Sequence, residues 1–443
     1  MTRSSPMHAS AAASAPPRPL RSVGGIEEYR FERNGLRLLY VPIAGMPVAL
    51  AMLTYAVGSR HEPAGLKGAS HMLEHMMFKG SARFCRERGS SVHESLLPLG
   101  AQTNATTWLD RTQYFTLVPE PHLELVAEIE ADRMRHLRLA PADLEAERGV
   151  VLNEYDRCNA DPLERVHLAL WNTAYPHHPY GHPVLGTRED IRVLERDALF
   201  AYYRRHYRPD RATLSIIGGV DRARALEIAQ RHFGGLDAGT AEIPCEPGPE
   251  PAQTAERRHT LRAADAPDWV MLGYRSPPAT SADVDALEVL GDALLGGKLS
   301  RLYRPLLGSG LATAAWCSVS RLRDDGLFQA MAQPAQPGDH ARIERLLRGA
   351  IDAIRRDGIS EQELARARSR LLGRLATSRD GPAAIAMQLN EAIAAGDWTA
   401  YATAAQRIEA VTAADVQRVA ARHLRDAGLS VVHLLQDDAG ATA

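Results

Sequence analysis

The sequence predicts an α+β protein built from two similar halves. In each half, segments with strand character alternate with amphipathic helices. A Pro- and Glu-rich run interrupts the chain near its middle, and the segments on either side of it resemble one another. At 443 residues the chain is long enough for two or three domains.

Strand character is clearest in four segments. Val48–Val57 is a buried apolar run, and Arg111–Val118 alternates between apolar and polar residues. Val270–Tyr274 and Leu429–Leu434 are further strand candidates in the second half. Because helical patterns separate these segments, each half is expected to combine a sheet with helices.

Two pairs of segments carry the internal repeat. Leu139–Glu154 is matched by Ile359–Arg374, and both begin with a helix-start signal and continue as an amphipathic helix. Arg205–Ile216 is matched by Arg422–Val431, in each case a helix end that runs into a strand. Chance similarity between amphipathic helices is the alternative explanation.

The Pro-rich run Pro244–Gln253 is interpreted as an interdomain linker. The predicted organisation is a disordered tail over residues 1–25, a first domain over 26–240, a linker over 241–256 and a second domain over 257–443. The tail is rich in Ala, Ser, Pro and Arg and contains no acidic residue, which weakly resembles an organelle transit peptide. It lacks the apolar core of a secretory signal.

The composition is that of a soluble globular protein, with 45% hydrophobic and 24% charged residues. A formal net charge of -2 argues against nucleic acid or an anionic membrane as partner. The four scattered cysteines indicate neither a disulfide framework nor a thiolate metal site. No stretch approaches the ~20 apolar residues of a membrane span. The expected location is the bacterial cytoplasm, or the periplasm if a signal has been removed.

The most informative motif is His71-Met72-Leu73-Glu74-His75. Residues four apart share one face of a helix, so both imidazoles can reach one metal ion. This H-x-x-E-H order is the inverse of the H-E-x-x-H zinc-protease signature. Such ligands with one open position suit Zn²⁺, and Glu74 could take a proton from water. The alternative is a chance pair of polar residues. However, the small and apolar neighbours indicate a buried helix, and a bound metal ion would compensate for the cost of burying these polar side chains.

A third protein ligand is usual in zinc hydrolases. The predicted helix Glu145–Tyr155 offers Glu145, Glu147 and Glu154. Glu147 and Glu154 share a helix face, so one could bind the metal while the other supports it.

The second half is not expected to bind metal. At an offset of about 220 residues, the motif and the glutamate helix fall on residues that cannot replace the ligands, namely Gly291, Leu294, Leu295 and Arg374. The second half would then serve substrate binding or enclosure.

Several motifs in order resemble the pitrilysin-type inverzincin zinc peptidases, and within them the two-domain bacterial peptidases related to the mitochondrial processing peptidase β subunit. The resemblance extends from about Tyr29 to about Leu435. The matching segments are His71–Gly80 (HMLEHMMFKG), Asn104–Phe115 (NATTWLDRTQYF), Glu147–Tyr155 (ERGVVLNEY), His178–Gly186 (HPYGHPVLG) and Gly296–Tyr303 (GGKLSRLY).

The resemblance implies a fold and a set of roles. The fold is two homologous α/β-sandwich domains that face each other as a clam shell around a chamber. His71, His75 and Glu154 would bind zinc, and Glu147 would support them from the second shell. Glu74 would be the general base, which also protonates the leaving amine.

The resemblance also implies how substrate binds. Asn104 and Ala105 would lie on an edge strand to which an extended peptide adds, although Asn104 could instead serve only the strand itself. The segment that contains His177, His178 and His182 is treated as a structural loop.

One departure from the family pattern concerns the second half. An Arg and a Tyr that many family members use to bind the substrate carbonyl are replaced here by Leu306 and Thr313. Arg301 and Tyr303 lie nearby at a different spacing and are expected to pack and cap their helix. The chain is therefore predicted to form a dimer, with a homologous metal-free subunit as the candidate partner that supplies the missing pair.

The function predicted is a zinc-dependent endopeptidase for peptides or unfolded segments. Two alternatives are a non-catalytic assembly or core-type subunit and a peptide-binding partner with a structural zinc. Structural zinc sites usually have four closed protein ligands, and the motifs supply three.

Overall fold

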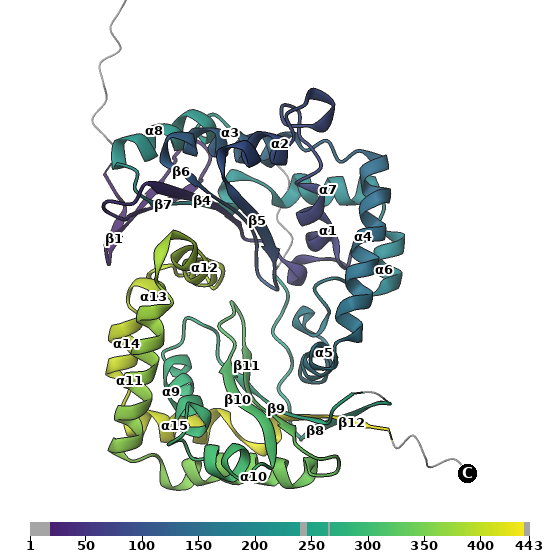
Figure 1. Ribbon diagram of the computed structural model, residues 1–443, viewed down its shortest axis with the longest axis vertical. Coiled ribbons are helices and arrows are strands. Elements are labelled where there is room, and N and C mark those ends of the chain that lie inside the picture. The colour runs from purple at the N-terminus through teal and green to yellow at the C-terminus, as the bar shows by residue number, and fades with distance from the viewer. Residues whose placement is uncertain (1–17, 240–245, 265, 438–443) are drawn as a thin grey trace, which may run out of the picture.

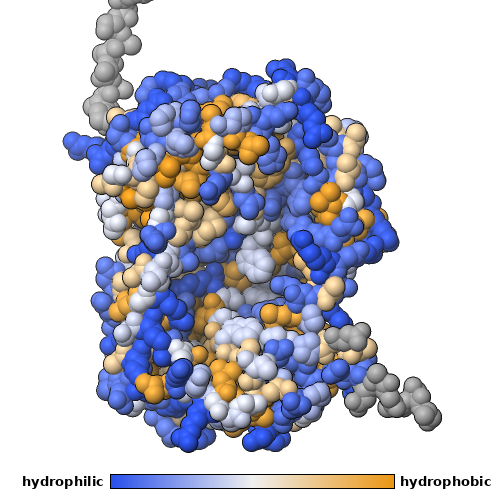
Figure 2. Space-filling view, in the orientation of Figure 1, coloured by the Kyte–Doolittle hydropathy of each residue, from blue (hydrophilic) through white to orange (hydrophobic). Residues whose placement is uncertain are grey.

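The computed structural model describes residues 18–239, 246–264 and 266–437. Two β-sheets, one from each half of the chain, face each other as a clam shell and are surrounded by helices (Figure 1). The space-filling view shows a recess between the two halves on this face (Figure 2). The fold class predicted from the sequence is confirmed.

The first sheet has seven strands in the order β1-β2-β3-β7-β4-β6-β5. Neighbouring strands are antiparallel except for β3 and β7. The central strands β7 and β4 are buried along almost their whole length, which explains their continuous apolar runs. The strands are β1 (Arg21–Val23), β2 (Ile26–Arg30), β3 (Arg37–Pro42), β4 (Val48–Tyr55), β5 (Gln102–Thr107), β6 (Thr112–Pro119) and β7 (Ala212–Gly218).

The second sheet repeats the topology of the first. Its order β8-β12-β9-β11-β10 corresponds to β3-β7-β4-β6-β5, and the pair β8–β12 is parallel like the pair β3–β7. The duplication inferred from the sequence is therefore present in the strand order. The strands are β8 (Arg257–Ala263), β9 (Trp269–Ser276), β10 (Ala312–Val319), β11 (Gly326–Pro334) and β12 (Leu429–Gln436).

Helices follow the same repeat. The segments matched in sequence fall on α4 and α11, and the motif helix α1 corresponds to α9. The first half contains α1 (Ala69–Met76), α2 (Val92–Leu96), α3 (Leu123–His136), α4 (Pro141–Ala160), α5 (Pro162–Ala174), α6 (Arg188–Val193), α7 (Arg196–His206) and α8 (Arg222–Phe233). The second contains α9 (Asp283–Leu295), α10 (His340–Asp357), α11 (Glu361–Thr377), α12 (Gly381–Ala394), α13 (Thr399–Ala402), α14 (Ala404–Ala410) and α15 (Ala413–His423).

Each half gives one helix to the sheet of the other half. Helix α5 packs its buried Val166 and Leu170 against Met271 and other apolar residues of the second sheet. Helix α12 packs Leu389 against residues of the first sheet that include Met52. In Figure 1, α12 lies against the inner face of the first sheet and α5 lies beside the second. The halves therefore share two of their hydrophobic clusters.

The ends of the predicted domains differ in part from the structure. Arg21–Val23, within the predicted tail, forms β1 and pairs with β2, so the tail prediction is wrong for this segment. Residues 1–17 lie outside the described residues, as do 240–245 at the start of the predicted linker. Residues 246–256 contain no helix or strand and lead directly into β8. None of the helices in the described part of the chain combines the length and apolar character needed to cross a bilayer.

Candidate active site

Three predicted metal ligands converge at one point of the first half. His71 and His75 project from α1, and Glu154 projects from the neighbouring α4. The Nε2 atoms of His71 and His75 lie 3.6 and 3.4 Å from Glu154 Oε2. A tetrahedral ion with ligand bonds of about 2.1 Å holds its ligands about 3.4 Å apart, so this donor set fits zinc. Within the described ranges, no other group of three such side chains converges in this way.

Helix α1 is fixed at its N-terminal end by a carboxylate that the sequence analysis did not single out. Glu62 is buried and accepts hydrogen bonds from the backbone N–H groups of Gly68 and Ser70, at 2.8 and 2.7 Å. Gly68 has φ 82°, and a Cβ there would lie 2.4 Å from the carbonyl oxygen of Leu185. The position therefore requires glycine. Leu185 belongs to the histidine-containing segment 178–186, which thus packs against the start of the motif helix.

The second histidine is oriented from behind by Glu147. His75 Nδ1 lies 2.8 Å from Glu147 Oε1, and Glu147 also forms an ion pair with Lys79. An Nδ1–H bonded to this carboxylate leaves the Nε2 lone pair of His75 facing Glu154. By contrast, the Nδ1 of His71 is buried without a hydrogen-bond partner among the described residues.

The two histidines have opposite pKa shifts. Burial lowers the pKa of His71 to about 4, and the neighbouring His75 adds to this effect. Burial also acts to lower the pKa of His75, but hydrogen bonds to Glu154 and Glu147 outweigh it and raise that pKa. The bond to His75 lowers the pKa of Glu154. The site therefore holds a carboxylate beside two imidazoles, and the lowered pKa keeps the imidazole of His71 in its neutral form. This donor set suits a divalent cation.

The predicted general base, Glu74, belongs to the motif helix α1, and its side chain reaches strand β5. Thr107, at the end of β5, donates a hydrogen bond of 2.6 Å from Oγ1 to Glu74 Oε2. Burial raises the pKa of Glu74, and the bond from Thr107 opposes this shift. Thr107 was not among the predicted site residues, although it belongs to the segment 104–115 that carried the family resemblance.

Strand β5 is an edge strand of the first sheet, paired with β6 alone among the described strands. It carries Asn104 and Ala105, the predicted peptide-binding residues. Asn104 is exposed, and its side-chain oxygen accepts a bond from the N–H of Ala105 at 2.9 Å. The strand therefore offers a free backbone edge next to the glutamate Glu74.

The segment that contains His177, His178 and His182 makes structural contacts. His178 is buried and bonds through Nε2 to Asp324 of the second half at 3.1 Å. Neither His177 nor His182 joins a metal-like cluster among the described side chains.

The oxyanion-binding pair is absent at its expected positions. Leu306 is fully buried in a π-helical turn, and Thr313 bonds to the Gln333 side chain at 2.8 Å. Arg301 is held by Glu363 of α11 at 2.6 and 2.9 Å, a contact with a different helix and not a cap of its own.

In the second half, an ion pair stands at the place that corresponds to the candidate metal site. Asp292, next to Gly291 on α9, is buried and bonds to Arg370 at 2.7 Å and to Arg374 at 3.2 Å. Arg374 is the counterpart of Glu154, so the position that holds a candidate metal ligand in the first half holds a positively charged guanidinium in the second. Asp292 and Arg374 line a cavity of about 550 Å³.

Comparison with known proteins places this geometry in a family. Residues 43–188 match a family model described as "Insulinase (Peptidase family M16)", and residues 194–371 match one described as "Peptidase M16 inactive domain". A Mycobacterium leprae protein described as an uncharacterized zinc protease is 30% identical over 348 residues, which cover 77% of this chain and 76% of that protein. The chain belongs to peptidase family M16. The resemblance drawn from the motifs is thereby confirmed.

Another relative and two solved structures are similar over most of their length. The zinc protease PqqE of Helicobacter pylori is 27% identical over 75% of each chain. A crystal structure of a Helicobacter pylori protease has a TM-score of 0.86 and 25% identity, covering 94% of this chain and 100% of that one. The first half of the periplasmic protease PqqL of Escherichia coli has a TM-score of 0.76 and 17% identity, over 95% of this chain and 94% of that half.

Proposed function

We propose that this M16 chain is a zinc-dependent endopeptidase that acts on peptides or unfolded segments. One observation carries the proposal: two imidazoles and a carboxylate converge at the spacing of a zinc site, beside a second, separately held carboxylate. A purely structural metal site has no need of that additional group, Glu74. The names of relatives described as zinc proteases support the same choice.

In this proposal His71, His75 and Glu154 hold the ion, and Glu147 orients His75. A zinc ion bound there supplies a Lewis acid that polarises the scissile carbonyl and acidifies water. Glu74 accepts the proton of the attacking water and passes it to the departing amine nitrogen. The raised pKa of Glu74 suits a group that must hold this proton between the two steps.

Substrate would bind as an added strand. The free edge of β5 can form main-chain hydrogen bonds with an extended peptide, and Asn104 and Ala105 lie on this strand. Main-chain recognition depends weakly on sequence but requires an unfolded segment. Enclosure between the two facing sheets would exclude folded proteins.

The missing oxyanion pair favours a two-subunit enzyme. Because Leu306 and Thr313 provide no charged or phenolic group, we propose that a homologous metal-free subunit supplies an Arg and a Tyr. Loss of one oxyanion donor typically costs about 10²–10³ in rate. The similarity to one half of the longer PqqL chain is compatible with a unit that functions in pairs.

The test is peptide cleavage by the purified, zinc-loaded chain, with Glu74→Gln and His71→Ala as variants. We expect Glu74→Gln to retain zinc and to lose about 10²–10⁴ in turnover, whereas His71→Ala should lose the zinc. Wild-type turnover in Glu74→Gln would contradict the mechanism, whereas no cleavage by the zinc-loaded wild-type chain, alone or with a partner, would favour the non-catalytic alternatives.

The same assay separates the two-subunit proposal from the peptidase proposal. Weak cleavage that rises when a homologue carrying the Arg and Tyr is added would support pairing. Full activity of a homodimer would contradict it and leave the peptidase assignment in place.

A further inference from the structure

We propose that the second half of the chain, the metal-free half, positions the general base Glu74. In this inference Thr107 and Glu391 are positioning residues, and they act on Glu74 through the β5–β6 hairpin. The inference rests on the proposed function, because it assigns a task to residues around the same site. It gives the second half a catalytic contribution besides enclosure.

The first link is the bond between Thr107 and Glu74. Its length of 2.6 Å is that of a charge-assisted bond from a hydroxyl to a carboxylate. Glu74 has one oxygen bound to Thr107, which leaves the other free to meet water. The bond therefore selects one orientation of the carboxylate, provided that Thr107 itself is fixed.

The second link fixes the hairpin that carries Thr107. Arg111, four residues further on, donates from Nη1 to the side chain of Thr106 at 2.7 Å and also to its carbonyl oxygen at 3.3 Å. The same guanidinium donates from Nε and Nη2 to Glu391 Oε1 at 3.0 and 2.6 Å. Glu391 belongs to α12 of the second half. The Arg111 side chain thus connects Thr106, the neighbour of Thr107, to the second half.

This bridge is sheltered at its arginine end. The Arg111 side chain is 11% exposed and that of Glu391 is 44% exposed. Helix α12 is itself seated on the first sheet, where the buried Asn390 accepts a 2.8 Å bond from Thr54 of β4. Glu391 therefore presents its carboxylate from a helix whose position is defined.

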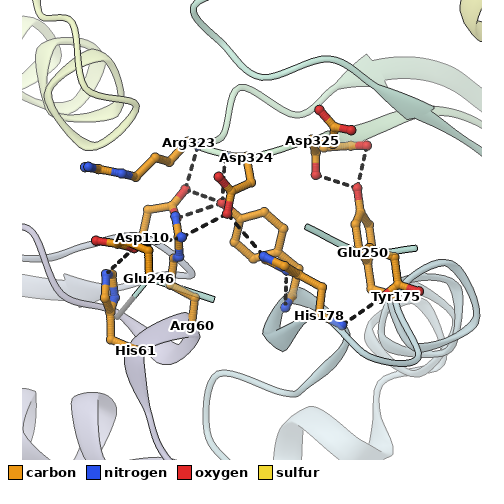
Figure 3. Close-up of polar contacts among 12 residues, drawn as sticks. Arg60, His61, Asp110, Tyr175, His178, Glu246, Glu250, Arg323, Asp324 and Asp325 are labelled. Carbon is orange, nitrogen blue, oxygen red and sulfur yellow. Dashed lines mark hydrogen bonds and ion pairs between the residues drawn. The ribbon is translucent and has the colours of Figure 1, made fainter. Parts of the chain in front are cut away.

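A second contact holds the same hairpin from the second half (Figure 3). The backbone N–H of Arg323 donates to Asp110 Oδ2 at 3.0 Å. On its other side, Asp110 accepts from Arg60 at 3.1 Å and from the Tyr180 hydroxyl at 2.7 Å. Adjacent residues of the hairpin, Asp110 and Arg111, are thus bound to different segments of the metal-free half.

The experiment compares two variants with matched controls. Thr107→Val removes the hydroxyl at constant shape, and Thr107→Ser restores it. Its control is Thr173→Val, which removes a hydroxyl bonded to the carbonyl oxygen of Ala169 within α5, outside the hairpin. Glu391→Leu removes the acceptor of Arg111. Its control is Glu288→Leu, which removes an acceptor of Arg321 within the second half.

We expect Thr107→Val to lower kcat about 10- to 100-fold with KM and zinc content unchanged, because small misplacements of reacting groups cost rate. Thr107→Ser should recover most of that loss. Glu391→Leu should lower kcat several-fold, and its effect should not multiply with that of Thr107→Val, since both act through Glu74. Both controls should retain wild-type kcat.

Hydrogen exchange gives a readout that does not depend on turnover. Glu391→Leu, unlike Glu288→Leu, should speed amide exchange in the hairpin over residues 102–119. Unchanged exchange there, wild-type kcat in Thr107→Val, or independent multiplication of the two effects would each overturn the inference. If the wild-type chain cleaves no peptide with or without a partner, the proposed function fails separately. The exchange result still decides whether Glu391 holds the hairpin over residues 102–119 in place.

Discussion

His75 is oriented by two charged residues outside the five-residue motif. Glu147 bonds to its Nδ1, and Lys79 pairs with Glu147 in turn. Burial acts to raise the pKa of Glu147, but the contacts with Lys79 and His75 lower it overall. Glu147 is therefore held as a carboxylate, the form that fixes the His75 tautomer. Outer residues of this kind are as much a part of a metal site as its ligands.

Replacement of Lys79 by Met should weaken zinc binding without abolishing it. The Glu147 carboxylate would lose its charged partner, and its hold on His75 would loosen. We expect zinc affinity to fall about 10-fold, within the range for outer-shell changes, measured by competition with a chromogenic chelator. The matched control is Lys298→Met, at an exposed lysine of the second half. Equal affinities in Lys79→Met and wild type would show that Lys79 does not support the site.

Helices α4 and α11 show how one element serves two purposes in the duplicated fold. Helix α4 carries Glu154 into the candidate metal site, and α11 carries Arg374 to the buried Asp292 at the corresponding place. The start of α11 is stabilised by a capping box in which Ser360 and Glu363 exchange bonds. Glu363 also binds Arg301, which lies five residues before the position of the missing arginine.

The α11 contact predicts a pH dependence of stability. The bond from Arg301, helped by the backbone N–H of Ser360, lowers the pKa of Glu363 to about 2. A carboxyl whose pKa is depressed in the folded state adds stability above its unfolded pKa, and that stability is lost as pH falls toward the folded value. Glu363→Gln should therefore lower the urea midpoint at pH 7, and the difference from wild type should shrink below about pH 5. A difference that is constant from pH 7 to pH 4 would contradict this assignment.

At the scale of the whole molecule, the two halves are joined by exchanged helices as well as by the chain. Helices α5 and α12 each bury an apolar face on the opposite sheet. Trp398, just after α12, is fully buried and donates a 3.0 Å bond to Glu28 of the first sheet. The halves should therefore unfold together.

Leu389→Ala tests this coupling. Leu389 is fully buried between α12 and the first sheet, so its truncation should cost about 2–5 kcal/mol of the free energy of unfolding. Leu299→Ala, at a leucine that is 71% exposed, should change it by no more than about 0.5 kcal/mol. Urea denaturation followed by circular dichroism should show a single transition at a lower midpoint for Leu389→Ala. Two separate transitions would mean that the halves are stabilised independently.

Much of the fold follows from local sequence patterns. Val48–Val57 and Arg111–Val118 were predicted as strands, and β4 and β6 occupy nearly the same residues because apolar runs and alternation reflect burial along each strand. The first 25 residues were predicted to be disordered, yet Arg21–Val23 pairs with β2. A short edge strand is stabilised by its neighbour and has little pattern of its own.

By itself, the sequence determined that His71, Glu74 and His75 share one helix, because helical spacing is local. It also determined the repeat, and through several motifs together the family. Helix spacing left both Glu147 and Glu154 as candidate ligands, and the family resemblance selected Glu154. Only the tertiary structure decided that Thr107 binds Glu74 and that Arg111 reaches Glu391. These contacts join residues that are far apart in the chain. Periodicity shows which face of a helix is buried, but only the packed fold shows what lies against it.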